Sequence, residues 1–511
     1  MYPVYDWIDY HAMNTPDAIA LIDHHSDRVL RYATLNERCN RGANYLQALG
    51  IRPKDRVAVL AHNTTDIMEL MFACQKLGAI FVPLNWRLAA PELQVILDDC
   101  QPSVLFSGDE FKTVASALTA SLGIATIGLS DGRDGDYERG LQAASPDYRL
   151  HPQTHDDTWI IMYTSGTTGT PKGACITHGN VLFSSLNQTL RFGLGSHSRC
   201  LTVLPLFHVG GLFLFATFLM HLGGSAVIVR QFEPRVCLRL LSDPDLAITD
   251  IFGVPTIFLF MSQLPAFADA DLSRLARVMV GGAPAPLDLL QAYTAKGVAI
   301  GQGFGMTETA TTGTALSAYG SLDKLGSSGL PSLHAELRVV DAQGQDVPRG
   351  EVGELWIRGP AISPGYWNRP EANAAAFTNG WFHTGDAVRV DEDGYYYIVD
   401  RWKDMFISGG ENVYPAEIEN ALLRLKEVAE AAVIGVSDPR WGEVGCAYIA
   451  LRDGASLTEQ AVIEHCRANL AGFKVPKHVH FLSEIPHNAA GKVLKQELRR
   501  HYQGRQQSGI A

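Results

Sequence analysis

Apolar and polar positions follow two different periods along most of the chain. Residues 63–76 carry apolar side chains at helical spacing, and the apolar run 79–84 that follows predicts a strand. The short β-branched runs 225–229 and 277–280 each end at a polar residue or at glycines, which is typical of buried strands. This repeated alternation, from about residue 19 to residue 400, predicts an α/β fold with largely parallel sheets.

The pattern changes near residue 400. An acidic turn at 391–394 precedes a strand rich in tyrosine and β-branched residues at 395–399. The chain beyond it is the size of one small domain and has a mixed α+β pattern. We therefore predict a large N-terminal domain of parallel-sheet α/β subdomains over residues 1–400 and a small α+β C-terminal domain over 401–511.

One apolar window, residues 209–229, holds His221 as its only ionisable group. The glycine pairs 210–211 and 223–224 interrupt this run. A membrane-spanning helix needs about 20 uninterrupted apolar residues. The window therefore predicts two shorter buried elements.

The composition is that of an ordinary globular protein. Of 511 residues, 46% are hydrophobic and 19% charged, which excludes a disordered or collagen-like chain. The formal net charge of -12 argues against nucleic acid or an anionic membrane surface as the main partner. Eight cysteines without a C-x-x-C pair favour reduced, buried thiols. Together with a start that lacks a basic segment followed by an apolar one, they favour a cytoplasmic location.

Hydroxyl-bearing residues and glycines are concentrated at residues 163–173, directly after the apolar run 159–162. Glycines let backbone N–H groups approach an anion, hydroxyls add donors, and Lys172 adds a positive charge. The segment is not a Walker loop, because Pro171 stands where that pattern needs a glycine. Taken alone, the pattern fits either a phosphate-binding loop or a polar surface turn.

Further segments resolve this ambiguity. Residues 163–173 resemble the signature loop of the adenylate-forming superfamily, which contains acyl-CoA synthetases, luciferases and peptide-synthetase adenylation domains. The family's other motifs have counterparts in the same order: 303–308 (aromatic-Gly-Met-Thr-Glu segment), 384–386 (ribose-binding turn), 400–404 with 408–415 (hinge and following loop) and 488–492 (C-terminal lysine loop). The resemblance spans nearly the whole chain and is closest to AMP-binding fatty- or aryl-acid CoA ligases.

The resemblance implies a reaction in two steps. A carboxylate attacks the α-phosphate of ATP, which releases pyrophosphate and leaves an acyl-adenylate. The thiol of coenzyme A then displaces AMP. Family members rotate the small C-terminal domain between the steps, about a hinge that corresponds to Lys403. ATP, Mg2+ and coenzyme A are therefore the expected cofactor and co-substrates.

The resemblance also assigns roles to residues at matching positions. Lys492 would bridge the substrate carboxylate and the α-phosphate, a contact worth about 100–1000-fold in rate. Glu308 would bind Mg2+, a hard cation that prefers oxygen ligands, and Thr307 would contact the α-phosphate. Asp386 and Arg401 would bind the ribose. The remaining nucleotide contacts are expected from Thr164, Ser165, Gly166, Thr167, Thr168, Lys172, Gly282, Ala283, Gly303, Phe304 and Gly305.

Residues 204–211 resemble the acyl-site segment of carboxylic-acid CoA ligases. They lack the aspartate with which amino-acid adenylation domains bind an amine, and His208 would gate the carboxylate pocket. The other predicted pocket residues are small or apolar, so we expect either a medium- to long-chain fatty acid or an aromatic, hydroxycinnamate-type monocarboxylic acid. The predicted acyl pocket comprises Phe207, His208, Gly211, Gly253, Val254, Gly281 and Phe304. The predicted coenzyme A contacts are Ser408, Gly409, Gly410, Trp441 and Lys474.

Three alternative functions fit the same motifs. A luciferase-like monooxygenase would share them. An adenylating enzyme that loads a separate carrier protein would need the same residues. A non-catalytic acyl or nucleotide sensor should have lost the charged residues, whereas Lys172, Glu308, Asp386, Arg401 and Lys492 are all present. A homodimer is a further hypothesis.

Overall fold

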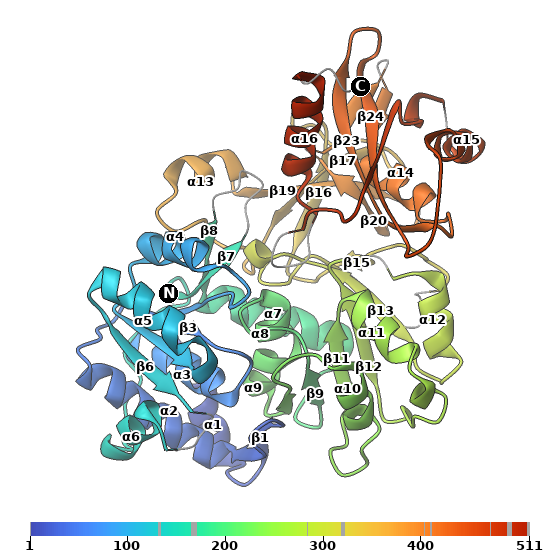
Figure 1. Ribbon diagram of the computed structural model, residues 1–511. Coiled ribbons are helices and arrows are strands. Elements are labelled where there is room, and N and C mark those ends of the chain that lie inside the picture. Colours follow the sequence, from blue (N-terminus) through green and yellow to red (C-terminus); the bar gives the residue numbers. More distant parts are fainter. Residues whose placement is uncertain are drawn as a thin grey trace. The chain divides into compact units, whose positions relative to one another are not determined.

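The computed structural model forms two compact units (Figure 1). It describes residues 2–130, 134–164, 171–283, 285–317, 322–402, 404–408, 411–470, 472–487 and 493–507. The first unit comprises Met1–Leu337 and Ile357–Phe382, and the second comprises Arg338–Trp356 and His383–Ala511. The predicted domain boundary at residue 400 stays a prediction, because the hinge residue Lys403 lies outside the described residues.

A six-stranded sheet in the first unit has the order β6-β5-β3-β4-β7-β8 and is parallel except for the antiparallel pair β7 and β8. Its strands are β3 (Arg56–Leu60), β4 (Ile80–Pro83), β5 (Val104–Gly108), β6 (Ala125–Leu129), β7 (Thr158–Thr164) and β8 (Lys172–Thr177). The helices that precede and connect them are α1 (Trp7–Asn14), α2 (Tyr32–Ala48), α3 (Thr65–Leu77), α4 (Ala90–Cys100), α5 (Lys112–Leu122) and α6 (Asp136–Ala143).

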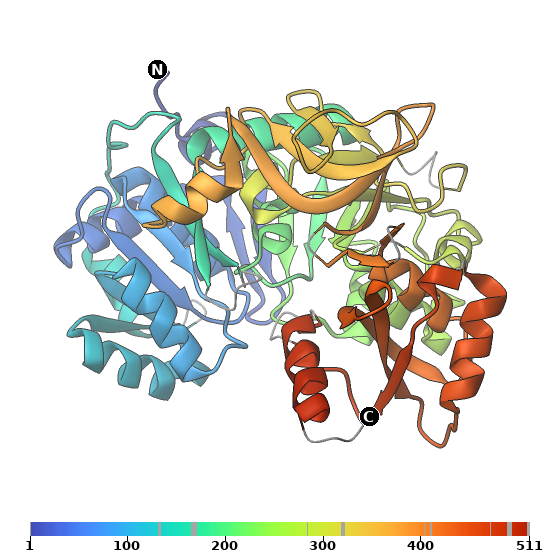
Figure 2. The same ribbon diagram turned by 90° about the horizontal axis from the view of Figure 1, so that it is seen from above.

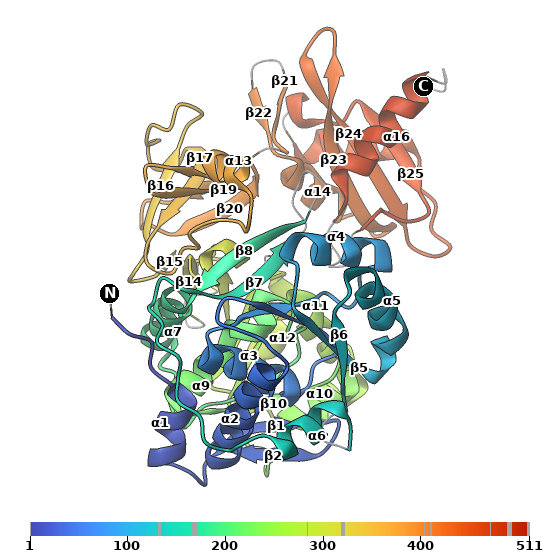
Figure 3. The same ribbon diagram turned by 90° about the vertical axis from the view of Figure 1, so that its left-hand side faces the viewer.

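Alternate residues of these strands face two separate cores. On β3, Val57 and Val59 pack with α2 and α3, whereas Ala58 and Leu60 pack with α4 and α5. Figure 3 shows these helix pairs on opposite faces of the sheet. Burial on both faces explains the apolar runs of the parallel strands.

A nine-stranded sheet in the first unit has the order β15-β14-β13-β12-β11-β9-β10-β1-β2. Strands β1 and β9 to β13 pair in parallel, and β2, β14 and β15 add antiparallel edges. The strands are β1 (Ile19–Asp23), β2 (Arg28–Arg31), β9 (Arg199–Thr202), β10 (Ser225–Ile228), β11 (Asp250–Gly253), β12 (Arg277–Gly281), β13 (Ile300–Phe304), β14 (Thr314–Leu316) and β15 (Leu330–Pro331). The helices along this stretch are α7 (His178–Phe192), α8 (Val209–Leu212), α9 (Phe218–Leu222), α10 (Pro234–Leu241), α11 (Pro255–Ser262) and α12 (Leu287–Thr294).

The apolar window 209–229 forms buried short elements, as predicted. Helix α8, a π-helical turn (Phe213–Thr217) and α9 run in succession, with a kink where Phe215 has a φ of 69°. Gly223, at φ 78°, ends this segment before β10 begins. Within the ranges that the structure describes, no helix is long and apolar enough to cross a membrane.

The remaining strands form two five-stranded sheets. One has the order β16-β17-β19-β18, with β20 beside β19, and the other has the order β22-β21-β24-β23, with β25 beside β24. Their elements are β16 (Glu336–Val340), β17 (Val352–Arg358), α13 (Pro370–Ala376), β18 (Phe377–Thr378), β19 (Trp381–Val390), β20 (Tyr396–Arg401), β21 (Phe406–Ser408), β22 (Glu411–Val413), α14 (Pro415–Leu422), β23 (Val428–Asp438), β24 (Gly442–Leu451), α15 (Glu459–Asn469), β25 (His478–Leu482) and α16 (Lys495–Gln507).

Helices cover both faces of the C-terminal sheet. Ile418 of α14 and Val462 of α15 share one core with Val433 of β23, whereas Leu498 of α16 packs with Ile434 in another. Figure 2 shows α15 and α16 on either side of this sheet. The segment after residue 401 is therefore α+β, as its mixed pattern predicts.

Candidate active site

The described ends of the predicted phosphate loop lie side by side. Strands β7 and β8 pair so that Thr164 faces Lys172, and the Thr164 hydroxyl donates to the backbone oxygen of Lys172 at 3.4 Å. The loop therefore joins two neighbouring antiparallel strands. Its residues Ser165, Gly166, Thr167 and Thr168 lie outside the described residues.

Lys172 and Glu308 both contact the side chain of Tyr366. The Lys172 Nζ lies 5.3 Å from the centroid of the Tyr366 ring, and the Tyr366 hydroxyl donates to Glu308 Oε1 at 2.8 Å. Glu308 is 7% exposed, on a 3-10 turn (Thr307–Thr309) with Thr307 beside it. The fold thus brings a cation and a carboxylate from two predicted motifs into one cluster.

The turn that carries Glu308 follows the carboxyl end of β13. Gly305 fits there because a Cβ at this position would lie 2.3 Å from the backbone oxygen of Thr311. On the neighbouring parallel strand, Gly281 pairs with Gly303, and Gly282 and Ala283 follow. Carboxyl ends of parallel strands are the usual place for a ligand in α/β sheets. The predicted residues of β11, β12 and β13 therefore share one sheet edge.

The predicted acyl segment lies against the same edge. The ring of Phe252, on β11, lies 3.0 Å from where a Cβ would stand at Gly210 and 3.1 Å from the corresponding position at Gly281. A Cβ at Gly211 would lie 2.1 Å from the backbone oxygen of Pro205. The backbone contact at Gly211 excludes a Cβ, and the two ring contacts leave little room for one. Gly253 and Val254 directly follow Phe252.

His208 is the N-cap residue of α8, and its Nδ1 accepts from the N–H of Gly210 at 3.2 Å. The side chain of His208 is exposed to solvent, although many protein atoms surround the ring. Desolvation, and secondly the charge of Arg87, lower the pKa of His208. A neutral ring whose Nδ1 accepts carries its proton on Nε2, so His208 offers an N–H donor.

Trp86 and Arg87 lie beside Phe207 and His208, and neither is among the predicted site residues. The rings of Trp86 and Phe207 are 6.1 Å apart, and the Arg87 guanidinium lies 5.0 Å from the Trp86 ring centroid. Both residues follow the carboxyl end of β4. Because ligands in α/β proteins bind at the carboxyl ends of parallel strands, the position of Trp86 and Arg87 just after a predicted strand could have identified them as site residues.

The second unit holds the predicted ribose-binding residues. Asp386 is 4% exposed on β19, and the strand register pairs it with Arg401 on β20. Gly385, at φ 68°, donates its N–H to Glu354. This pairing brings the two predicted residues together along the backbone. The structure describes the backbone of Arg401 but not its side chain.

The predicted coenzyme A contacts fall partly outside the described residues. Ser408 is buried and pairs with Gly442, so Trp441 lies next to it, 40% exposed. The ammonium of Lys474 contacts both carboxylate oxygens of Glu417 at 2.7 Å. Gly409, Gly410, Lys403 and Lys492 lie outside the described residues.

Family models match both parts of the chain. The model of the AMP-binding enzyme matches residues 8–367, and that of the AMP-binding enzyme C-terminal domain matches residues 417–492. The chain belongs to this family of adenylate-forming enzymes. This result confirms the resemblance drawn from the motifs.

Relatives and solved structures agree with this assignment. A feruloyl-CoA synthase of Amycolatopsis sp is 42% identical over 497 residues, which covers 97% of this chain and 98% of the relative. A long-chain-fatty-acid–CoA ligase of Mycobacterium tuberculosis is 39% identical, covering 96% of each chain. The o-succinylbenzoate CoA synthetase of Bacillus subtilis, in complex with its acyl-adenylate, superposes with a TM-score of 0.88 at 33% identity, covering 98% of this chain and 99% of that one.

These comparisons confirm the predicted fold class and reaction class. The protein is an AMP-forming acid–thiol ligase that acts through an acyl-adenylate, with an α/β N-terminal part and a small C-terminal domain. A carboxylic acid, ATP and coenzyme A are its substrates. The individual roles of the predicted site residues stay predictions.

Proposed function

We propose that the acid is an aromatic monocarboxylic acid of the hydroxycinnamate type. The supporting observation is the set of rings around the acyl segment: Trp86 lies 6.1 Å from Phe207, and Phe252 lies against Gly210 and Gly281. Flat aromatic ligands gain from edge and face contacts with such rings. The 42% identity to a feruloyl-CoA synthase supports the same class.

In this proposal, Thr164 and Lys172 bind the β- and γ-phosphates together with Ser165, Gly166, Thr167 and Thr168, and Thr307 contacts the α-phosphate. Asp386 and Arg401 hold the ribose, and Gly282, Ala283, Gly303, Phe304 and Gly305 line the nucleotide site. The catalytic lysine, Lys492, offsets the charge that builds between the carboxylate and the α-phosphate.

Glu308 would hold Mg2+. The ion usually takes one or two carboxylates and completes its shell with water and substrate phosphates, so a single buried carboxylate beside the phosphate loop suits it. When bound, Mg2+ would neutralise negative charge on the phosphates. A solved structure of the Bacillus subtilis o-succinylbenzoate CoA synthetase contains ATP and a magnesium ion.

His208 would orient the acid. Its Nδ1 is taken by the Gly210 N–H, so the Nε2–H of the neutral ring can donate to the substrate carboxylate. A lowered pKa keeps the ring neutral at physiological pH. Phe207, Gly211, Gly253, Val254, Gly281 and Phe304 would line the pocket beyond it.

The acceptor in this proposal is coenzyme A, bound near Ser408, Gly409, Gly410, Trp441 and Lys474 after the C-terminal domain, residues 401–511, rotates about Lys403. Because Lys474 contacts Glu417, it would exchange a carboxylate for a phosphate of coenzyme A. A cytoplasmic location and a homodimer complete the proposal.

Pyrophosphate release, measured with ATP and Mg2+ against a panel of acids, tests the proposal. We expect ferulate and cinnamate to exceed acetate, benzoate and palmitate, with AMP and a CoA thioester as products. Lys492→Ala should reduce release by about 100–1000-fold. A preference for palmitate would refute the aromatic class, release without thioester would indicate a carrier-protein acceptor, and no release with any acid would indicate a sensor.

A further inference from the structure

Tyr366 contacts both charged groups of the cluster described above. Its hydroxyl donates to Glu308 Oε1 at 2.8 Å, and its ring lies 5.3 Å from Lys172 Nζ. The predicted motifs contain Lys172 and Glu308 but not Tyr366. A hydrogen bond from a neutral donor fixes the orientation of a carboxylate without cancelling its charge.

The backbone around Tyr366 is held on several sides. The N–H of Tyr366 donates to Asn373 Oδ1 at 2.6 Å, and Asn373 Nδ2 donates to the backbone oxygen of Tyr366 at 3.1 Å. Tyr366 also bridges Ala174 of β8. On either side, Cys175 donates to Gly365 at 2.9 Å and Trp367 donates to Gly173 at 2.7 Å. The backbone that carries the Tyr366 side chain is therefore hydrogen-bonded to β8, the strand that begins at Lys172.

The same segment also holds the main chain of Glu308. The N–H of Ser363 donates to the Glu308 backbone oxygen at 2.7 Å, and the N–H of Gly365 donates to the Ser363 hydroxyl at 3.1 Å. Both the carboxylate and the backbone of Glu308 are thus hydrogen-bonded to the segment around Tyr366. Such an arrangement sets the position of the carboxylate relative to Lys172.

We propose that Tyr366 is a positioning residue for the metal–triphosphate site. Its hydroxyl occupies Oε1 of Glu308, so that Oε2 is the oxygen left for the metal, and its ring steadies the ammonium of Lys172 by a cation–π contact. The inference rests on the proposed roles of Glu308 and Lys172. Outer-shell partners of this kind typically contribute 10- to 100-fold in metal affinity.

The test is a Mg2+ titration of adenylate formation with Tyr366→Phe. This variant keeps the ring over which Lys172 lies and loses only the hydroxyl. We expect the apparent Mg2+ constant to rise by about 10- to 100-fold, while the rate at saturating Mg2+ changes by less than about two-fold. Thioester formation from a presynthesised acyl-adenylate should not change, because that intermediate has already lost its pyrophosphate.

Two further variants separate positioning from a structural role. In a Glu308→Gln background, Tyr366→Phe should have no additional effect on the Mg2+ constant, because Tyr366 acts through that carboxylate. Tyr397→Phe is the matched control, since its hydroxyl donates to Asp391 at 3.2 Å in the second unit, and its Mg2+ constant should equal that of the wild type.

ATP binding by calorimetry gives a readout that does not require turnover. Tyr366→Phe should weaken binding of ATP with Mg2+ and leave binding of ATP with a chelator unchanged. Equal losses in both conditions, or equal losses in both half-reactions with a lower melting temperature, would overturn the inference. If the wild type forms no adenylate with any acid, the proposed function fails, and the calorimetric comparison still decides the role of Tyr366.

Discussion

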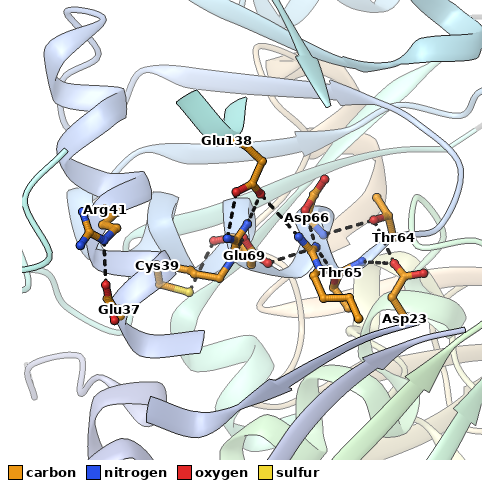
Figure 4. A network of polar contacts seen from close by, with 11 residues as sticks. Asp23, Glu37, Cys39, Arg41, Thr64, Thr65, Asp66, Glu69 and Glu138 are labelled. Carbon is orange, nitrogen blue, oxygen red and sulfur yellow. Dashed lines mark hydrogen bonds and ion pairs between the residues drawn. The ribbon is translucent and has the colours of Figure 1, made fainter. Parts of the chain in front are cut away.

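Arg38→Met is expected to destabilise the first unit, because Arg38 compensates two buried carboxylates. Its Nε donates to Glu69 Oε2 at 2.8 Å and its Nη1 to Glu138 Oε2 at 3.1 Å. The side chain of Glu69 is 0% exposed and that of Glu138 is 9% exposed. Figure 4 shows both carboxylates, together with Asp66, in one connected network.

The charges of the network set the size of the effect. Asp66, Glu69 and Glu138 face two guanidinium groups, those of Arg28 and Arg38. Removing one partner from a buried ion pair costs about 3–5 kcal/mol. Because Arg28 stays 3.2 Å from Glu69 Oε1, part of the compensation survives, and we expect about 3 kcal/mol, the lower end of that range. Methionine retains much of the apolar stem, so the loss reports mainly on charge.

Urea unfolding followed by tryptophan fluorescence measures this loss. The matched control is Arg139→Met, since Arg139 also contacts two carboxylates, Asp134 at 3.1 Å and Asp136 at 2.6 Å, but on the surface. We expect the control to unfold at the wild-type midpoint, because exposed ion pairs contribute little. Equal midpoints for Arg38→Met and the wild type would refute the reasoning, since the buried carboxylates would then not depend on Arg38.

Three further outcomes are expected. Burial raises the pKa of Asp66 from its ordinary value of 3.8 to about 7, so the folded state holds this proton more tightly than the unfolded state. The free energy of unfolding should therefore fall as pH rises from about 4 to 7 and level off above that range; Asp66→Asn should flatten this slope, and equal slopes for the variant and the wild type would contradict the role of Asp66. The ammonium of Lys495 lies 2.9 Å from Glu419, and burial raises the pKa of Glu419. Lys495→Met should therefore lower the stability of the second unit, measured by calorimetry, by about 2 kcal/mol, and adding Glu419→Gln should restore part of it. Gly305→Ala should reduce adenylate formation, because its Cβ would lie 2.3 Å from the Thr311 oxygen, and wild-type pyrophosphate release in that variant would contradict this steric reasoning.

Much of the fold follows from local periodicity. The helix predicted at 63–76 is α3 (Thr65–Leu77), and it ends at Gly78 with φ 80°, as a glycine after a helix indicates. The strand predicted at 79–84 is β4 (Ile80–Pro83). These elements are predictable because each depends on neighbours within a few positions. The order of strands in the sheets is not, since it depends on pairings between distant segments.

The candidate site divides in the same way. Lys172 and Glu308 stand in motifs that can be recognised from the sequence. The bond between Tyr366 and Glu308 joins positions 58 residues apart, and the contact of Arg38 with Glu138 joins positions 100 apart. Nothing in either local sequence specifies such a partner. Both contacts exist only because the strands and helices that carry them pack in one register.

Strand β8 connects the parts of the site that the motifs leave separate. Lys172 stands at its first position, Ala174 bridges Tyr366, and Cys175 accepts a hydrogen bond from Ser363 at 2.7 Å. A shift of this strand by one residue would turn its side chains to the opposite face and move Lys172 away from the ring of Tyr366. A chain that keeps every motif can therefore still lose the geometry of the metal–triphosphate site. The pairing of β8 with the segment around Tyr366 is what converts separate motifs into one site.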